Sequence, residues 1–103
     1  MPRILRSQQD YKLKVQSGGT ITLDTGPDTG KVLVPTGFVG LGTSIPAAIL
    51  DVQTTTSGIR FPNMTTTQKN AMTGMQKGTV IFDTTLNKLC VYNGTAWQTI
   101  TSA

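Results

Sequence analysis

The chain has 103 residues, a formal net charge of +4, a single Cys and no His. One Cys excludes an internal disulfide, and the absence of His removes the commonest general base and metal ligand. Hydrophobic residues make up 37% of the chain and charged residues 14%, which leaves little material for a large core. Thr and Gly are the commonest residues, and this composition favours β-strands and turns over helices.

The first ten residues are polar and basic and contain one apolar pair. We interpret residues 1–10 as an attachment arm that becomes ordered on a partner, with Arg3, Ile4, Leu5 and Arg6 as the docking residues. No stretch is apolar and long enough for a signal peptide or a membrane span, so we expect synthesis in the cytoplasm, no cleaved export signal and no membrane insertion. The basic residues form no recognisable nucleic-acid-binding motif, so we expect no nucleic-acid partner.

Short runs separated by turn residues fill the next part of the chain. Apolar and polar residues alternate at 11–15 and 20–24, and further short runs lie at 31–34 and 38–42, so we predict four strands. Glycine and proline provide the turns between them. Each strand carries too few apolar side chains to bury a core by itself. Sheets of this kind become stable when identical chains wrap around one another, so we expect residues 11–53 to form a β-rich module of this type.

One short helix is predicted in the second half of the chain. Pro62 holds the residue before it in an extended conformation and so excludes an earlier start. Either Thr65 or Thr66 can act as the N-cap of a helix over 68–72, which we expect to end at Thr73 and Gly74. A helix of one or two turns is marginal by itself and must pack against something.

A compact β-meander is predicted at the C-terminal end, from runs at 79–83, 88–92 and 95–100. Asn93 and Gly94 lie between the second and third runs. This dipeptide is the one most suited to a two-residue type I′ turn, because both central positions of that turn need φ > 0. Three short strands are close to the minimum for independent stability, so the sheet should need a partner surface.

Side chains alternate between two faces along these strands, which places Val80 and Phe82 together. Either Leu89 and Val91 or their neighbours in the second run could meet them, and the sequence leaves open which set faces inward. Cys90 lies among apolar strand residues and is predicted to be a buried small hydrophobe.

Several segments in succession resemble motifs of bacteriophage tail fibres and related bacterial surface fibres, over residues 39–100. Residues 40–52, GLGTSIPAAILDV, together with Val39 before them, resemble the motif V-G-I-G-T-x-x-P-x-x-x-L-D-V, with Leu41 in place of Ile. The other matching patterns are G-[ILF]-x-x-P-x-M-T-[TS]-x-Q-[RK] within residues 57–72, G-x-[VI]-x-[YF]-[DN]-T at 78–84, and Y-[ND]-G-x-x-W within 91–97.

The resemblance implies a mainly β fold, an intertwined homotrimeric β-fibre. Short strands would form a β-prism or a spiral-like shaft, followed by a small C-terminal knob with one short helix and a three-stranded β-meander. The expected modules are an attachment arm at 1–10, a shaft at 11–53 and a trimerising knob at 54–103, with the polar connector 54–58 marking the boundary between the last two.

The resemblance also implies a function as a structural protein of a virion. The trimeric fibre would be anchored to capsid or tail proteins of a tailed-phage particle through its N-terminus, with the knob driving trimerisation. We expect the turn residues Asn93 and Gly94 to shape the knob. The residues expected to form the knob core or the trimer interface are Phe61, Val80, Phe82, Leu89, Val91, Tyr92 and Trp97.

Two other functions remain open. The knob could act as an adhesin for a host cell-surface glycan or protein, with Phe82, Tyr92 and Trp97 as the rings on which a sugar stacks, or the protein could stabilise a capsid as a decoration protein. An exposed Trp97 would favour the adhesin.

Catalysis is not expected, because the five carboxylates form no recognisable motif. Asp24 and Asp28 flank a Gly-Pro turn, where hydrogen bonds to their own backbone are more typical than calcium binding. We therefore expect no enzyme activity, metal or cofactor.

Overall fold

The computed structural model describes residues 11–26 and 30–101. Contacts divide the chain into two units, unit 1 from Met1 to Gln53 and unit 2 from Thr54 to Ala103. The described residues are mainly β, with six short strands and one helix. The predicted attachment arm and Asp28 lie outside the described residues.

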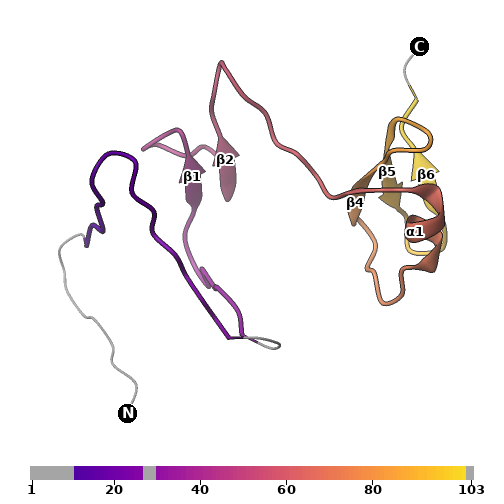
Figure 1. The fold of residues 1–103 in the computed structure, drawn as a ribbon, viewed down its shortest axis with the longest axis horizontal. Helices are drawn as coiled ribbons and strands as arrows, with labels where there is room; N and C mark the ends of the chain where they lie inside the picture. Colours follow the sequence, from indigo (N-terminus) through magenta and orange to yellow (C-terminus); the bar gives the residue numbers. More distant parts are fainter. Residues whose placement is uncertain (1–10, 27–29, 102–103) are drawn as a thin grey trace. The chain divides into compact units, whose positions relative to one another are not determined.

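Unit 1 contains one small parallel sheet, made of β1 (Val39–Leu41) and β2 (Leu50–Val52) (Figure 1). The ladder is extended at its two ends, where the Val39 N–H donates to the Ile49 carbonyl and the Gln53 N–H donates to the Leu41 carbonyl, each at 2.8 Å. The predicted strand at 38–42 is therefore present in shortened form.

The other three predicted strands of unit 1 are wrong for a single chain, since none of residues 11–15, 20–24 and 31–34 is in a strand. A strand needs a regular ladder of hydrogen bonds to a neighbouring strand, and these runs belong to neither of the two sheets. Their apolar side chains are left in water, with Leu13 77% exposed and Leu33 69% exposed.

Unit 2 contains a four-stranded sheet in the order β3-β4-β5-β6. The predicted meander is present, since β5 (Lys88–Tyr92) pairs antiparallel with both β4 (Val80–Asp83) and β6 (Trp97–Thr99). A fourth strand, β3 (Asn63–Met64), was not expected and pairs parallel with β4. It is too short to carry a periodic signal, and its place depends on backbone hydrogen bonds to β4.

The predicted type I′ turn after β5 is wrong. Gly94 has φ of 98°, but Asn93 is not in the left-handed region, and four residues separate β5 from β6. The Asn93 side-chain oxygen accepts hydrogen bonds from the Thr95 and Ala96 N–H groups, both at 2.8 Å. This Asx-type arrangement holds a wider loop and needs only one left-handed residue.

Helix α1 (Thr66–Ala71) confirms one of the two predicted N-caps. The Thr65 hydroxyl accepts a hydrogen bond from the Gln68 N–H, and the Gln68 side chain accepts one from the Thr65 N–H at 2.9 Å, which completes a capping box. The helix starts two residues before the predicted range and ends at Ala71, because Met72 is already extended.

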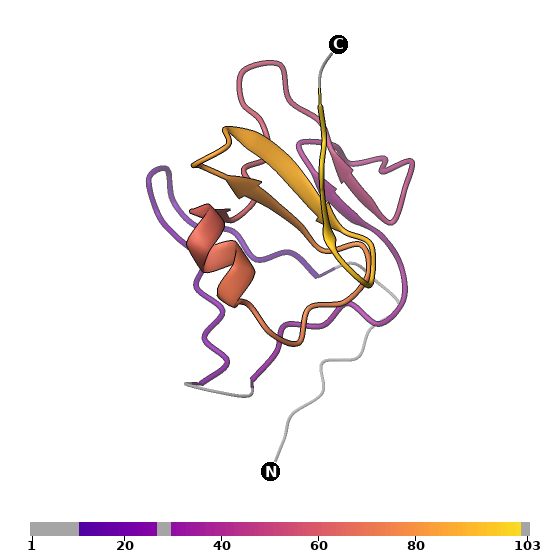
Figure 2. The ribbon, with the colours of Figure 1, turned by 90° about the vertical axis from the view of Figure 1, so that its right-hand side faces the viewer.

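The core of unit 2 lies between α1 and one face of the sheet. Ile81 is 1% exposed and Cys90 is 0% exposed, which confirms that this cysteine is buried. Lys69 of α1 reaches the same face, and Figure 2 shows the helix along one side of the strands. Because side chains alternate, Val80 and Phe82 point to the opposite face.

Candidate functional site

The sheet of unit 2 has one face that α1 leaves uncovered, and we call it the open face. Pairing registers place Asn63 opposite Phe82 and Gln98 opposite Val91 on this face, and the hydrogen bond from the Ile100 N–H to the Leu89 carbonyl continues the pattern. The open face consists of Phe61, Asn63, Val80, Phe82, Leu89, Val91, Gln98 and Ile100.

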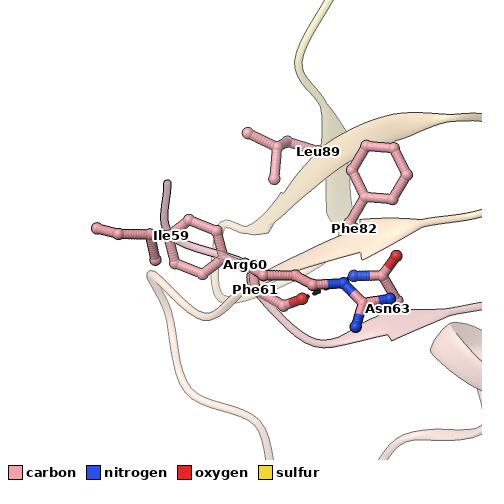
Figure 3. Close-up of a pocket in the computed structure, with 6 residues that line it drawn as sticks. All are labelled: Ile59, Arg60, Phe61, Asn63, Phe82 and Leu89. Carbon is pink, nitrogen blue, oxygen red and sulfur yellow. Dashed lines mark hydrogen bonds between the residues drawn. The ribbon is translucent and has the colours of Figure 1, made fainter. Parts of the chain in front are cut away.

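A pocket of about 380 Å³ lies on the β3 side of the open face (Figure 3). Phe61, Phe82 and Leu89 provide much of its apolar lining, and the Asn63 side-chain amide donates a hydrogen bond to the Phe61 carbonyl at 2.8 Å. The remaining lining residues are Ile59 and Arg60.

Large apolar side chains on the open face, and next to it, remain in contact with water. Phe61 is 40% exposed, Ile100 is 52% exposed and Ile59, on the pocket wall, is 60% exposed, whereas the inner-strand residues are half-buried. Exposed apolar side chains gathered beside one pocket are a feature of association sites and ligand-binding grooves.

The covered face holds a buried ion pair that the sequence did not reveal. The Lys69 ammonium lies 3.0 Å from Asp83 Oδ2, and both side chains are almost fully buried. The Thr66 hydroxyl donates to the same carboxylate at 2.7 Å, and the Thr85 and Leu86 N–H groups donate to its other oxygen at 2.9 and 3.0 Å. The carboxylate therefore joins α1, β4 and the β4–β5 loop.

Electrostatics keep both partners of this pair charged. Burial alone would raise the pKa of Asp83, but hydrogen bonds from Thr66, Leu86, Lys69 and Thr85 outweigh it and lower the pKa from 3.8 to about 2. The hydrogen bond to Asp83 raises the pKa of Lys69, against the opposing effect of burial. The two opposite charges lie in contact and are shielded from water, so the pair ties α1 to β4.

The predicted aromatic residues divide between the two faces. Tyr92 and Trp97 form a pair across β5 and β6, with ring centroids 5.3 Å apart and an interplanar angle of 61°. The register places both on the covered face with Cys90, half-buried, and the Trp97 indole N–H is buried without a hydrogen-bond partner in the part of the chain that the structure describes. Phe61 and Phe82 lie on the open face instead.

The motif of residues 40–52 has a physical basis in unit 1. Asp51 Oδ2 accepts a hydrogen bond from the Ala47 N–H at 2.7 Å, and its other oxygen accepts one from the Gln53 side chain at 2.8 Å, so these bonds lower the pKa of Asp51. Gly42 has φ of 81° and passes so close to the Gln53 carbonyl that a side chain would not fit. The motif therefore closes the connection between the two parallel strands.

The other sequence-predicted features have mixed outcomes. Asp24 bonds its own turn, accepting from the Gly26 N–H at 3.0 Å, as expected. The docking residues Arg3, Ile4, Leu5 and Arg6 lie outside the described residues. The sequence did not reveal the pairing of Lys69 with Asp83, because the two residues are distant in sequence. The position of Asp83 directly before a polar turn did indicate that its carboxylate could accept hydrogen bonds from that turn.

No group of three metal-binding side chains occurs within residues 11–26 and 30–101. The same residues include no helix that is long and apolar enough to cross a bilayer. A small β unit with one uncovered apolar face and a minimal core has the features of a self-associating structural module.

The comparison with protein families agrees with this class. The family model described as phage tail-like trimerisation region matches residues 39–103, and the chain belongs to this family. It is a trimeric structural protein of the phage tail-fibre type, which indicates a component of the virion. No curated protein and no solved structure matches the chain.

Proposed function

We propose that the protein is a homotrimeric fibre protein of a tailed-phage particle. In this proposal unit 2 is the knob that drives trimerisation, unit 1 contributes to an intertwined shaft, and residues 1–10 attach the fibre to capsid or tail proteins. The observation that carries it is the match to a trimerisation region, which includes β1, β2 and all of unit 2.

The lack of a core in unit 1 supports the intertwined shaft. None of its described residues is buried, and apolar side chains along it remain largely exposed, such as Leu13 at 77% and Ile45 at 84%. Alternating runs that are not strands within one chain can pair with the same runs in neighbouring chains. Pairing between chains would form backbone ladders and bury the exposed apolar side chains together.

The size of the core in unit 2 supports its role as the trimerising knob. Of its described residues only two apolar side chains are fully buried, Ile81 and Cys90. Folded units of this length rarely obtain enough stability from one core, and association is a common remedy. Three copies that pack their apolar surfaces against one another would bury side chains that a single copy leaves exposed.

A structural role rather than a catalytic one is proposed for the carboxylates. Asp51 holds the β1–β2 connection, Asp83 holds α1 and the β4–β5 loop, and Asp24 holds its own turn.

An adhesin would need an open aromatic platform, and Trp97 is instead half-buried beside Tyr92 on the face that α1 covers. These observations favour the structural fibre over the adhesin.

Sedimentation equilibrium on the full chain tests the proposed trimer. We expect a single species with three times the 11.0 kDa mass of the chain, with no dissociation at micromolar concentrations. A stable folded monomer would contradict the proposal.

A variant without residues 1–10 should still form the trimer but should not be incorporated into particles, and normal incorporation would refute the attachment role of the arm.

A further inference from the structure

We infer that three copies of this chain associate through the open face of unit 2, and that the face covered by α1 stays outside the contact. The inference rests on the proposed trimer and assigns it a surface. It also divides the apolar residues predicted for the knob into two groups, since Tyr92 and Trp97 belong to the covered face and stabilise each copy, whereas Phe61, Phe82 and Leu89 face a neighbouring copy.

The first argument is the distribution of charge. Every residue of the open face is uncharged, and Arg60 is the one charged residue in the lining of its pocket. The covered side carries Lys69, Asp83 and Lys88. Removing an ion from water costs much more than removing an apolar group, so the cores of interfaces are depleted of charged residues. The strand residues of the open face can lose their contact with water without this cost. On the covered side, Lys69 and Asp83 already pair with each other within the copy.

The second argument is the order of polar and apolar residues across the face. The two inner strands, β4 and β5, contribute only Val80, Phe82, Leu89 and Val91. The outer strands contribute the two amides, Asn63 from β3 and Gln98 from β6. An apolar centre with a polar border is the pattern of a protein–protein interface.

The occupant is a second copy of this chain rather than a different protein. All residues of the open face lie within 39–103, the part of the chain that matches a trimerisation region. In a threefold ring with the open faces turned to the axis, the inner strands of all copies approach the axis, and their apolar residues form one shared core. The contact between neighbouring copies is then head-to-tail, so that the β3 edge of one sheet lies beside the β6 edge of the next.

This arrangement gives the pocket an occupant. The pocket lies on the β3 side of the open face, and Ile100 lies beyond the end of β6 on the opposite side, 52% exposed. Ile100 of one copy therefore inserts between Phe61 and Leu89 of the next. A cavity of about 150 Å³ holds a benzene molecule, so 380 Å³ has room for an isoleucine side chain.

The test compares Leu89→Glu with Thr67→Glu. Leu89 is on the open face, and Thr67 is an exposed residue of α1, so the two variants add the same charge to opposite sides. By sedimentation, Leu89→Glu should be monomeric where the wild type and Thr67→Glu are trimeric. Its Trp97 fluorescence should stay native, because that ring packs on the covered face. A trimeric Leu89→Glu protein would overturn the inference, whereas a monomeric wild type would overturn the proposed function itself.

A cross-linking experiment tests the surface in a protein that keeps its inner strands. The double variant Phe61→Cys, Ile100→Cys should form disulfide-linked trimers on mild oxidation, visible on a non-reducing gel. The control Phe61→Cys, Asn70→Cys places the second thiol on α1 and should form none, and Cys90 is buried in both variants. The inference is refuted if the first variant remains unlinked while it sediments as a trimer, or if both variants cross-link equally.

Discussion

Truncation of Ile81 tests whether the small core of unit 2 holds each copy together. Ile81 is 1% exposed on β4 and pairs with Cys90 on β5, beneath α1. Replacing a buried Ile by Ala typically costs about 2–5 kcal/mol, and replacing it by Val about 0.5–1.5 kcal/mol. In a cooperative trimer the change occurs three times, so Ile81→Ala should cost roughly 6–15 kcal/mol of the free energy of unfolding, comparable with the whole stability of a typical domain.

Ile81→Ala should therefore not fold at room temperature, while Ile81→Val should fold and unfold at lower urea concentration. Urea unfolding followed by circular dichroism and by Trp97 fluorescence measures the loss. Thr67→Ala, at an exposed position of α1, is the control and should change the free energy of unfolding by about 0.5 kcal/mol or less per copy. Wild-type stability of Ile81→Ala would refute the account of the core, because it would show that this side chain is replaceable without a cavity.

The other predictions concern the ion pair, the β5–β6 loop and the aromatic pair. The folded state lowers the pKa of Asp83 from 3.8 to about 2, so the ionised carboxylate stabilises the fold above pH 3.8. This contribution is lost as the pH falls from 3.8 to about 2. The urea midpoint of the wild type should therefore fall in this window, and the midpoint of Asp83→Asn should fall less. Gly94→Val should lower the melting temperature more than Asn93→Ala, since a β-branched residue is strained at φ of 98°, and equal melts would contradict the loop geometry. Trp97→Ala should cost up to about 3 kcal/mol per copy, the lower limit for a fully buried ring. An unchanged melt would mean that the ring is dispensable, which would favour the adhesin.

The conformation of unit 1 bears on how the fibre assembles. The runs at 11–15, 20–24 and 31–34 have the alternation of strands but are not strands in a single chain. If they pair only between chains, trimerisation of unit 2 would bring three copies of each run together first. That order agrees with the proposed role of unit 2, because a nearby copy raises the effective concentration of the pairing partner.

Local features of the fold follow from the sequence alone. The capping box of α1 joins Thr65 and Gln68, three residues apart, and its hydrogen bonds are readable from residue types. The strands of the meander follow from alternation and the turns between them, and the burial of Cys90 follows from its apolar neighbours. In each case the determining contacts lie within a few residues.

Other features were decided by tertiary structure. Alternation placed Val80 and Phe82 together, but only the packing of α1 on the opposite face left that side open. Likewise, β3 exists because the chain returns beside β4, and Lys69 meets Asp83 because the helix lies on the sheet. Strand pairing and burial depend on residues distant in the chain, and the free energy of such a contact exists only when the fold brings both partners together. For the same reason the runs at 11–15, 20–24 and 31–34 have the sequence pattern of strands but are not strands, because alternation alone does not supply a paired neighbour.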